Sequence, residues 1–334
     1  MRKLIRKATG LTVGVATLLA GLVLPMTASA ESASPIDASP IIHYSFDNAL
    51  TSKTIANEGS AANSDATLSG DATVANGQIN LTGSQTISVP TTAIAGKKDV
   101  TVSIWLKNNY GNGNTAAAYI GAAKTGNYPA NGYWLLNPAN PSGYAKSVMT
   151  NATAADPNNS PWGTEVGPGS TNAATIGTKA TSDLALYTTV ISGTNSTMSF
   201  YLNGKQVGDA TYTIPAGGLT NYGDLVAYIG KSSYADPNSK LDVDDYAVYD
   251  TAISAADVTK LYDAQVLDKA EAAVKAAVPA SATEDFALPT SAAGVSIAWK
   301  SGNAAIAVDN ATGKATVTRP AATAADAEVT LTAT

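Results

Sequence analysis

The chain has few side chains suited to nucleophilic chemistry. It holds one histidine, His43, and no cysteine. A nucleophile needs a neighbouring base to activate it, and a zinc ion needs several nitrogen or sulfur ligands. His43 lies inside a strand-like run, and no serine or acid catalytic motif accompanies it. We therefore expect His43 to be a structural side chain.

Carboxylates are the other groups that could catalyse a reaction. Glycoside hydrolysis uses two of them, roughly 5 to 10 Å apart, and glycosidases of similar β-strand architecture carry them on one strand as Glu-x-Asp-x-x-Glu. That string is absent, and the glutamates after the first 30 residues are widely spaced: Glu31, Glu58, Glu165, Glu271, Glu284 and Glu328. We expect no active site within these 334 residues, and whether the parent protein is an enzyme stays open.

Aromatic side chains in polar loops are the candidates for binding a sugar. A sugar ring stacks on an aromatic face while amide and carboxylate groups read its hydroxyls. Residues 108–172 are rich in Asn and Gly and contain our four candidates, Trp162, Trp134, Tyr128 and Tyr144. Trp162 is foremost, because proline and glycine flank it in a turn-rich loop. Trp134 lies in the apolar run GYWLL, where packing inside the fold is the alternative.

The first 30 residues have the pattern of a secretory signal peptide. A basic start precedes an apolar stretch, residues 11–24, and Ala28-Ser29-Ala30 forms a small-residue cleavage site. This stretch is shorter than the roughly 18 uninterrupted apolar residues that a membrane anchor needs. We expect a mature chain that starts at Glu31, has no membrane span and is secreted or held at the bacterial cell surface.

Composition limits the partners of the chain. The net charge is −6, and no basic cluster follows the leader, so the contacts that neutralise phosphates are missing and we expect no nucleic-acid partner. Tyrosine (15) far outnumbers phenylalanine (3), which is typical of half-exposed strands with polar loops. Such surfaces favour a neutral polar ligand such as a polysaccharide or an oligosaccharide.

The residues from 41 to 249 follow the pattern of a β-sandwich. Residues 31–40 read as a flexible lead-in, and short β-like runs with turn residues between them follow. In the run 100–107 apolar and polar residues alternate, as in a half-buried strand. Asn203-Gly204 between two such runs predicts a hairpin.

Two helices and a second β region are predicted after residue 250. Ser254 to Asp257 has the form of a capping box and predicts a short helix over 255–264. Residues 266–278 predict a second helix that stops at Pro279. The domains are then 41–265, a helical linker at 266–280, and 281–334 with about five strands. The final run EVTLTAT has no turn after it, so we expect further C-terminal domains of the same chain.

Specific motifs resemble two bacterial families. HYSFD (43–47), VTVSIWLK (100–107), SFYLNGKQVG (199–208), YIGKS (228–232) and VDDYAVYDTAIS (243–254) resemble, in order, the laminin-G-like, concanavalin-A-like domains. The region from 281 resembles the atrophied bacterial Ig-like domain, with Trp299, Gly313 and Arg319-Pro320 in its motif. The resemblance implies an all-β chain, a concanavalin-A-like jelly-roll sandwich plus a partial Ig-like sandwich, with short connecting helices.

The resemblance also implies a role. Such domain pairs accompany secreted, bifidobacterial-type glycoside hydrolases that resemble arabinofuranosidases. It implies a non-catalytic carbohydrate-binding or accessory region of a hydrolase acting on plant or host glycans, with arabinan or xylan favoured. The alternative is a structural spacer or adhesin module that binds no sugar.

A structural calcium ion is a further implication of the resemblance. Related domains hold one with the acid that ends the first strand and an acid of the last strand, here Asp47 and Asp244. The loop 57–65 would supply backbone carbonyls, and Asp65 is the third candidate. By strand alternation Asp244, Tyr246 and Val248 share a face, which in the family turns inward. The alternative is that Asp244 accepts backbone N–H bonds at a turn.

Overall fold

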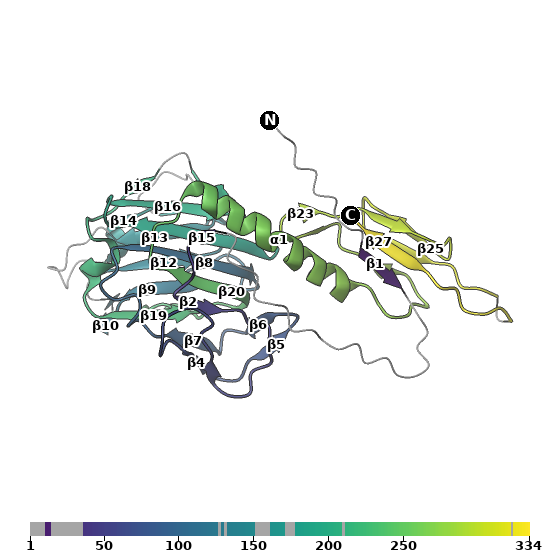
Figure 1. Ribbon diagram of the computed structural model, residues 1–334, viewed down its shortest axis with the longest axis horizontal. Helices are drawn as coiled ribbons and strands as arrows, with labels where there is room; N and C mark the ends of the chain where they lie inside the picture. Colours follow the sequence, from purple (N-terminus) through teal and green to yellow (C-terminus); the bar gives the residue numbers. More distant parts are fainter. Residues whose placement is uncertain are drawn as a thin grey trace. The chain divides into compact units, whose positions relative to one another are not determined.

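The structure is a computed structural model of the whole chain. It describes residues 11–14, 36–125, 128–129, 132–150, 161–170, 178–208, 211–321 and 323–334, and for 11–14, 124–125 and 128–129 only the backbone. The described residues fold mostly into β-sheets, with a single long helix (Figure 1). Contacts divide the chain into two compact units, Ala33–Ala264 and Gln265–Thr334 with the N-terminal residues to Ser32.

The first unit is a sandwich of two antiparallel sheets. One has eight strands in the order β14 (Glu165–Val166), β13 (Lys146–Thr150), β12 (Tyr133–Asn137), β9 (Ala118–Ala122), β19 (Leu225–Ile229), β7 (Thr86–Val89), β4 (Ala66–Ser69) and β3 (Thr54–Ile55). A 3-10 helix η1 (Pro161–Thr164) precedes β14, and η2 (Gly218–Tyr222) precedes β19. A separate pair, β10 (Lys124–Thr125) and β11 (Tyr128–Pro129), precedes β12.

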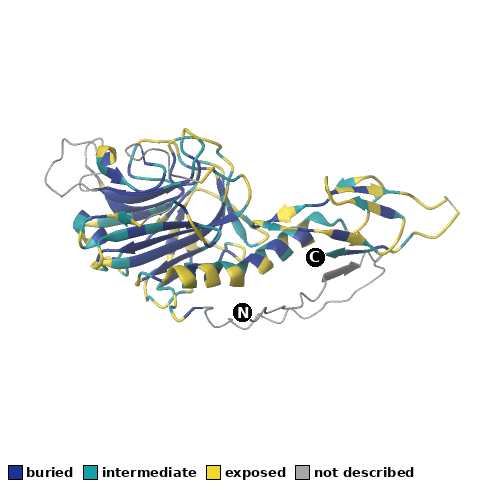
Figure 2. Ribbon diagram, turned by 90° about the horizontal axis from the view of Figure 1, so that it is seen from above, coloured by how far each residue is buried: buried dark blue, intermediate teal, exposed yellow. Residues whose placement is uncertain are grey.

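The second sheet of this unit has nine strands. Its order is β17 (Lys205–Gln206), β16 (Thr197–Leu202), β15 (Ala185–Ser192), β8 (Asp99–Asn108), β20 (Leu241–Tyr249), β6 (Gln78–Leu81) and β5 (Thr73–Ala75), with β18 (Tyr212–Thr213) beside β16 and β2 (Ile42–Tyr44) beside β20. The inner faces of the two sheets form one apolar core, and Figure 2 shows these strands as largely buried. The jelly-roll-like sandwich expected from the motifs is confirmed.

The predicted hairpin lies between β16 and β17. Asn203 and Gly204 both have positive φ, 51° and 71°, which is the backbone that a two-residue type I′ turn needs and that Asn-Gly adopts at low strain. Leu202 pairs with Lys205 directly across the turn. The hairpin prediction is therefore confirmed.

A single helix, α1 (Ala255–Ala277), replaces the two predicted helices. The capping box is present, because the Asp257 N–H donates to Ser254 Oγ at 3.1 Å and Ser254 Oγ donates to Asp257 Oδ2 at 2.8 Å. The separation into two helices was wrong, since residues 263–266 contain no glycine or proline to break the helix. In the first unit, Val258 and Leu261 pack against the nine-stranded sheet.

The second unit contains short strands in three sheets. They have the orders β1 (Leu11–Gly14), β27 (Thr330–Ala333) and β24 (Trp299–Ser301); β21 (Phe286–Ala287), β26 (Lys314–Val317) and β25 (Ile306–Asp309); and β22 (Ser291–Ala292) with β23 (Val295–Ser296). The second unit has its own apolar core, in which Trp299 packs with Ala270 and Val274 from α1. Within the described part of the chain, no helix is long and apolar enough to cross a membrane.

Candidate functional site

One face of the eight-stranded sheet carries aromatic side chains outside the main core. On β12 the ring of Trp134 enters the core, so strand alternation turns Tyr133 and Leu135 to the opposite face. Tyr119 on β9 pairs with Leu135 on one side and with Tyr228 of β19 on the other. The three tyrosines therefore lie on the outer face of this sheet.

These rings and two more form the aromatic cluster, defined as Tyr119, Tyr133, Tyr228, Tyr234 and Trp162. Tyr119 stacks on Tyr133 with ring centroids 5.7 Å apart, and Tyr234 meets Tyr133 edge-on at 5.4 Å. Trp162 of η1 meets Tyr234 at 6.1 Å with an interplanar angle of 63°. Trp162 keeps 39% of its surface exposed, whereas Tyr133 keeps 1%. Trp162 is thus the exposed end of the cluster.

A buried ion pair lies beneath the cluster. Glu165 on β14 is 3% exposed, and its Oε2 lies 2.6 Å from Lys146 Nζ on β13. The Tyr133 hydroxyl donates to Glu165 Oε1 at 2.7 Å. Burial and then the Glu165 charge raise the pKa of Tyr133 well above its ordinary value, so this hydroxyl is a permanent donor. The contacts join three neighbouring strands, β12, β13 and β14.

Of the four predicted sugar-binding residues, one has a ring that the structure shows exposed to solvent. Trp162 has an exposed ring. Trp134 is fully buried and donates from Nε1 to Ser147 Oγ at 3.1 Å, which corrects its assignment, because a ring inside the core offers no face to a ligand. Tyr144 is half-buried, with Lys179 Nζ 4.2 Å above its ring. The side chain of Tyr128 lies outside the described residues.

Two of the three predicted calcium ligands lie close together. Gly77, in the turn between β5 and β6, has a φ of 72°, and a Cβ there would come within 3.2 Å of Asp47 Oδ1 and 3.9 Å of Asp244 Oδ2. Both carboxylates therefore border the space that Gly77 leaves open. Two carboxylates beside a glycine turn fit a cation with oxygen ligands.

Asp65 does not join this pair. Its Oδ1 accepts the N–H of Asn57 at 2.8 Å, within a loop that folds back on β2. Where the structure describes the chain, no three histidine, aspartate or glutamate side chains gather in a metal-binding arrangement. Asp65 therefore lies apart from Asp47 and Asp244, since its carboxylate binds the backbone of its own loop.

The orientation of Asp244 also differs from the sequence-based expectation. A bulge interrupts the pairing of β20 with β8 between Asp244 and Ala247, so the extra residue breaks the alternation. Tyr246 enters the core while Asp244 pairs with Trp105, whose side chain lies on the outer face. Asp244 is nevertheless only 2% exposed. Tyr246 and Val248 share the inner face, and Asp244 does not.

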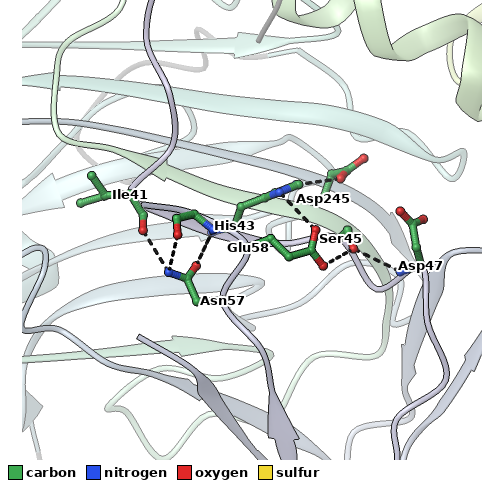
Figure 3. Close-up of polar contacts among 8 residues, drawn as sticks. Ile41, His43, Ser45, Asp47, Asn57, Glu58 and Asp245 are labelled. Carbon is green, nitrogen blue, oxygen red and sulfur yellow. Dashed lines mark hydrogen bonds and ion pairs between the residues drawn. The ribbon is translucent and has the colours of Figure 1, made fainter. Parts of the chain in front are cut away.

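A polar network supports the strand that leads to Asp47. His43 Nε2 lies 3.0 Å from Asp245 Oδ1, and its Nδ1 lies 3.6 Å from Glu58 Oε2. Ser45 Oγ donates to Glu58 Oε1 at 2.6 Å and accepts the Asp47 N–H at 3.4 Å. Figure 3 shows this chain of contacts. The two ring nitrogens of His43 face different carboxylates. This network is therefore better suited to holding neighbouring segments together than to binding one metal ion.

A comparison of the sequence with known protein families agrees with the β-sandwich fold. Residues 81–259, more than half of the chain, match the model of the concanavalin A-like lectin/glucanases superfamily. The chain belongs to this superfamily. Residues 266–334 match the atrophied bacterial Ig domain, so the second unit is Ig-like. No curated protein matches the chain.

Solved structures resemble the lectin-like domain, as we now call residues 33–264. Domain 4 of AbnA, a GH43 extracellular arabinanase from Geobacillus stearothermophilus, in complex with arabinotriose, is 19% identical over 67% of this chain and 98% of that chain, with a TM-score of 0.51. The receptor binding domain of botulinum neurotoxin mosaic serotype C/D is 18% identical, with a TM-score of 0.45, and this chain covers 52% of it. At 19% identity, the similarity to the arabinanase domain shows that the two domains share a fold.

Sequence reasoning missed Tyr234, Glu165 and Lys146 in the lectin-like domain. Tyr234 comes from the segment after β19 and reaches Tyr133, which is about 100 residues earlier. Glu165 was considered only as a catalytic acid. Its position three residues after Trp162, in a stretch with few charges, was the one available signal.

Proposed function

We propose that the lectin-like domain is a non-catalytic carbohydrate-binding module of a secreted or cell-surface glycoside hydrolase. The observation that carries this proposal is the exposed ring of Trp162 beside Tyr234, on the outer face of a sheet. A large exposed aromatic ring offers an apolar face to the C–H groups of a sugar, and stacking there removes apolar surface from water.

Arabinan or xylan is the ligand class that we favour. The arabinanase domain in complex with arabinotriose supports the choice of a plant-derived neutral glycan. The absence of a basic cluster in a chain of net charge −6 also favours a neutral ligand, because an acidic surface repels polyanions. The leader-like residues 1–30 support secretion, which places the domain where polysaccharides occur.

We further propose one structural calcium ion at Asp47 and Asp244. The supporting observation is that both carboxylates border the space beside Gly77. Calcium takes about six to eight oxygen ligands, so backbone carbonyls would complete the site. Bound calcium would neutralise two neighbouring carboxylates where β2, β20 and the β5–β6 turn meet, which stabilises the fold rather than supplying chemistry.

Affinity electrophoresis of the full chain through gels containing arabinan, xylan or no polysaccharide tests the glycan proposal. We expect retardation by at least one polysaccharide, and at least tenfold weaker retention for Trp162→Ala, equal to about 1.4 kcal/mol of binding free energy. Leu267→Ala is the matched control, because among the described residues Leu267 is the other large exposed apolar side chain, at 63%. Wild type that runs equally in every gel, with and without polysaccharide, would favour the spacer role instead, and equal retardation of wild type and Trp162→Ala would place the binding site away from Trp162.

A further inference from the structure

A closed ring of contacts holds the exposed aromatic pair of Trp162 and Tyr234. Trp162 meets Tyr234, Tyr234 meets Tyr133 edge-on, and the Tyr133 hydroxyl donates to Glu165. Glu165 follows Trp162 by three residues, and this short piece of chain closes the ring. A displacement of Glu165 therefore changes the angle between the two outermost rings.

Lys146 pairs with the same carboxylate, and its charge is also felt in the segment that carries Tyr234. Its ammonium lies 2.6 Å from Glu165 Oε2. Desolvation raises the pKa of Asp236, and the nearby Lys146 charge opposes that rise. Asp236 follows Tyr234 by two residues. The Glu165–Lys146 ion pair therefore contacts the segment of Trp162 directly and reaches Tyr234 through Tyr133.

The backbone alone fixes η1 weakly. β14, which follows η1 directly, is the edge strand of its sheet and has two residues. It pairs with β13 only at Val166 with Met149 and at Glu165 with Thr150. A two-residue edge strand contributes little pairing, so the side-chain contacts of Glu165 add substantially to what holds this segment in place.

We infer that Glu165 and Lys146 are positioning residues of the glycan platform: they hold Trp162 and Tyr234 at the angle that a sugar ring requires, and they do not touch the sugar. This inference rests on the proposed function. The burial of Glu165 agrees with it, because a carboxylate that is 3% exposed can affect a ligand only through the rings that it positions.

The test compares Glu165→Gln and the double variant Glu165→Gln/Lys146→Met with wild type in the full chain. The double variant leaves no uncompensated buried charge, and replacing a buried ion pair by neutral groups is often tolerated. Trp162 is the only tryptophan above 4% exposure, so acrylamide quenching of tryptophan fluorescence reports on its environment without any ligand. Affinity for the polysaccharide that retards wild type is the second readout.

We expect both variants to show increased acrylamide quenching and at least fivefold weaker glycan binding, with the double variant melting near wild type. Asp250→Asn is the matched control, since it breaks the exposed Lys97–Asp250 pair at 2.8 Å on the other sheet, and it should change neither readout. A double variant with wild-type quenching and wild-type affinity would overturn the inference. If wild type binds no glycan, the proposed function fails, while the quenching comparison still decides whether the ion pair positions Trp162.

Discussion

Trp162 and Trp134 lie in the same loop-rich stretch of sequence and have opposite surroundings in the structure. Trp162 has 39% of its surface exposed and Trp134 has none. The flanking proline and glycine identified Trp162 before the structure did. Trp134 could not be assigned, because every residue of the run from Tyr133 to Leu136 is apolar, and alternation cannot be read from such a run.

The buried hydroxyls of two tyrosines make a matched comparison at the residue scale. Tyr133→Phe removes the donor to Glu165 Oε1, a hydrogen bond to a charged group, so the free energy of unfolding should fall by about 1.5 to 3 kcal/mol. Tyr187→Phe removes a buried hydroxyl that has no hydrogen-bond partner among the described residues, and it should be neutral or slightly stabilising. Urea unfolding monitored by circular dichroism measures both, and equal losses would contradict the role of the Tyr133 bond.

At the scale of elements, β20 explains why part of the site was not predictable. Regular strand geometry would place Asp244, Tyr246 and Val248 on one face, yet β20 pairs with β6 at Leu241–Val243 and with β2 at Tyr246–Val248. The bulge lies where one neighbour ends and the other begins. Asp245 has a φ of 42° there, a strained backbone for a residue other than glycine. Long-range pairing of this kind leaves no mark in a local pattern, whereas the hairpin at Asn203-Gly204 does.

The β5–β6 turn provides a test of calcium at this junction. Gly77→Ala places a Cβ near Asp47 and forces a positive φ on alanine, so it should lose both stability and calcium binding. Gly96→Ala is the control, because Gly96 has a φ of 76° with nothing within 4 Å of its Cβ position. Calcium at about 100 times its Kd should raise the free energy of unfolding by about 2.7 kcal/mol in wild type and in Gly96→Ala.

Thermal melts with calcium and with EDTA measure that increment in each variant. In Gly77→Ala we expect the calcium-dependent increment to disappear. A wild-type melt that is the same in calcium and in EDTA would contradict the calcium proposal and leave the glycan site untouched.

For the whole molecule, the sequence was most informative about architecture. Ordered motifs predicted a lectin-like domain followed by an Ig-like domain, and both are confirmed by the family models. The single helix was not predicted as such, because the change of domain at Gln265 leaves no break in a helix-forming sequence. The site was predicted only in its exposed residue, Trp162, since the pairing of β12, β13 and β14 and the approach of Tyr234 cannot be read from a local pattern.

Salt dependence is the prediction that belongs to the whole molecule. The chain carries a net charge of −6, and the proposed ligand is neutral, so binding should come from ring stacking and not from ion pairs. The Glu165–Lys146 pair is buried and little screened by salt. We expect glycan affinity to change less than about twofold between roughly 0.05 and 0.5 M sodium chloride. A steep fall measured by isothermal titration calorimetry would indicate an acidic glycan bound by lysines.

The central claim is that a sugar stacks on Trp162. The most direct measurement is a titration of the intrinsic fluorescence of the full chain with arabino- and xylo-oligosaccharides, in wild type and in Trp162→Phe, because the other three tryptophans are almost fully buried. We expect a saturable change in emission in wild type that is absent in Trp162→Phe. An identical saturable change in both proteins, or none in wild type at millimolar sugar, would contradict it.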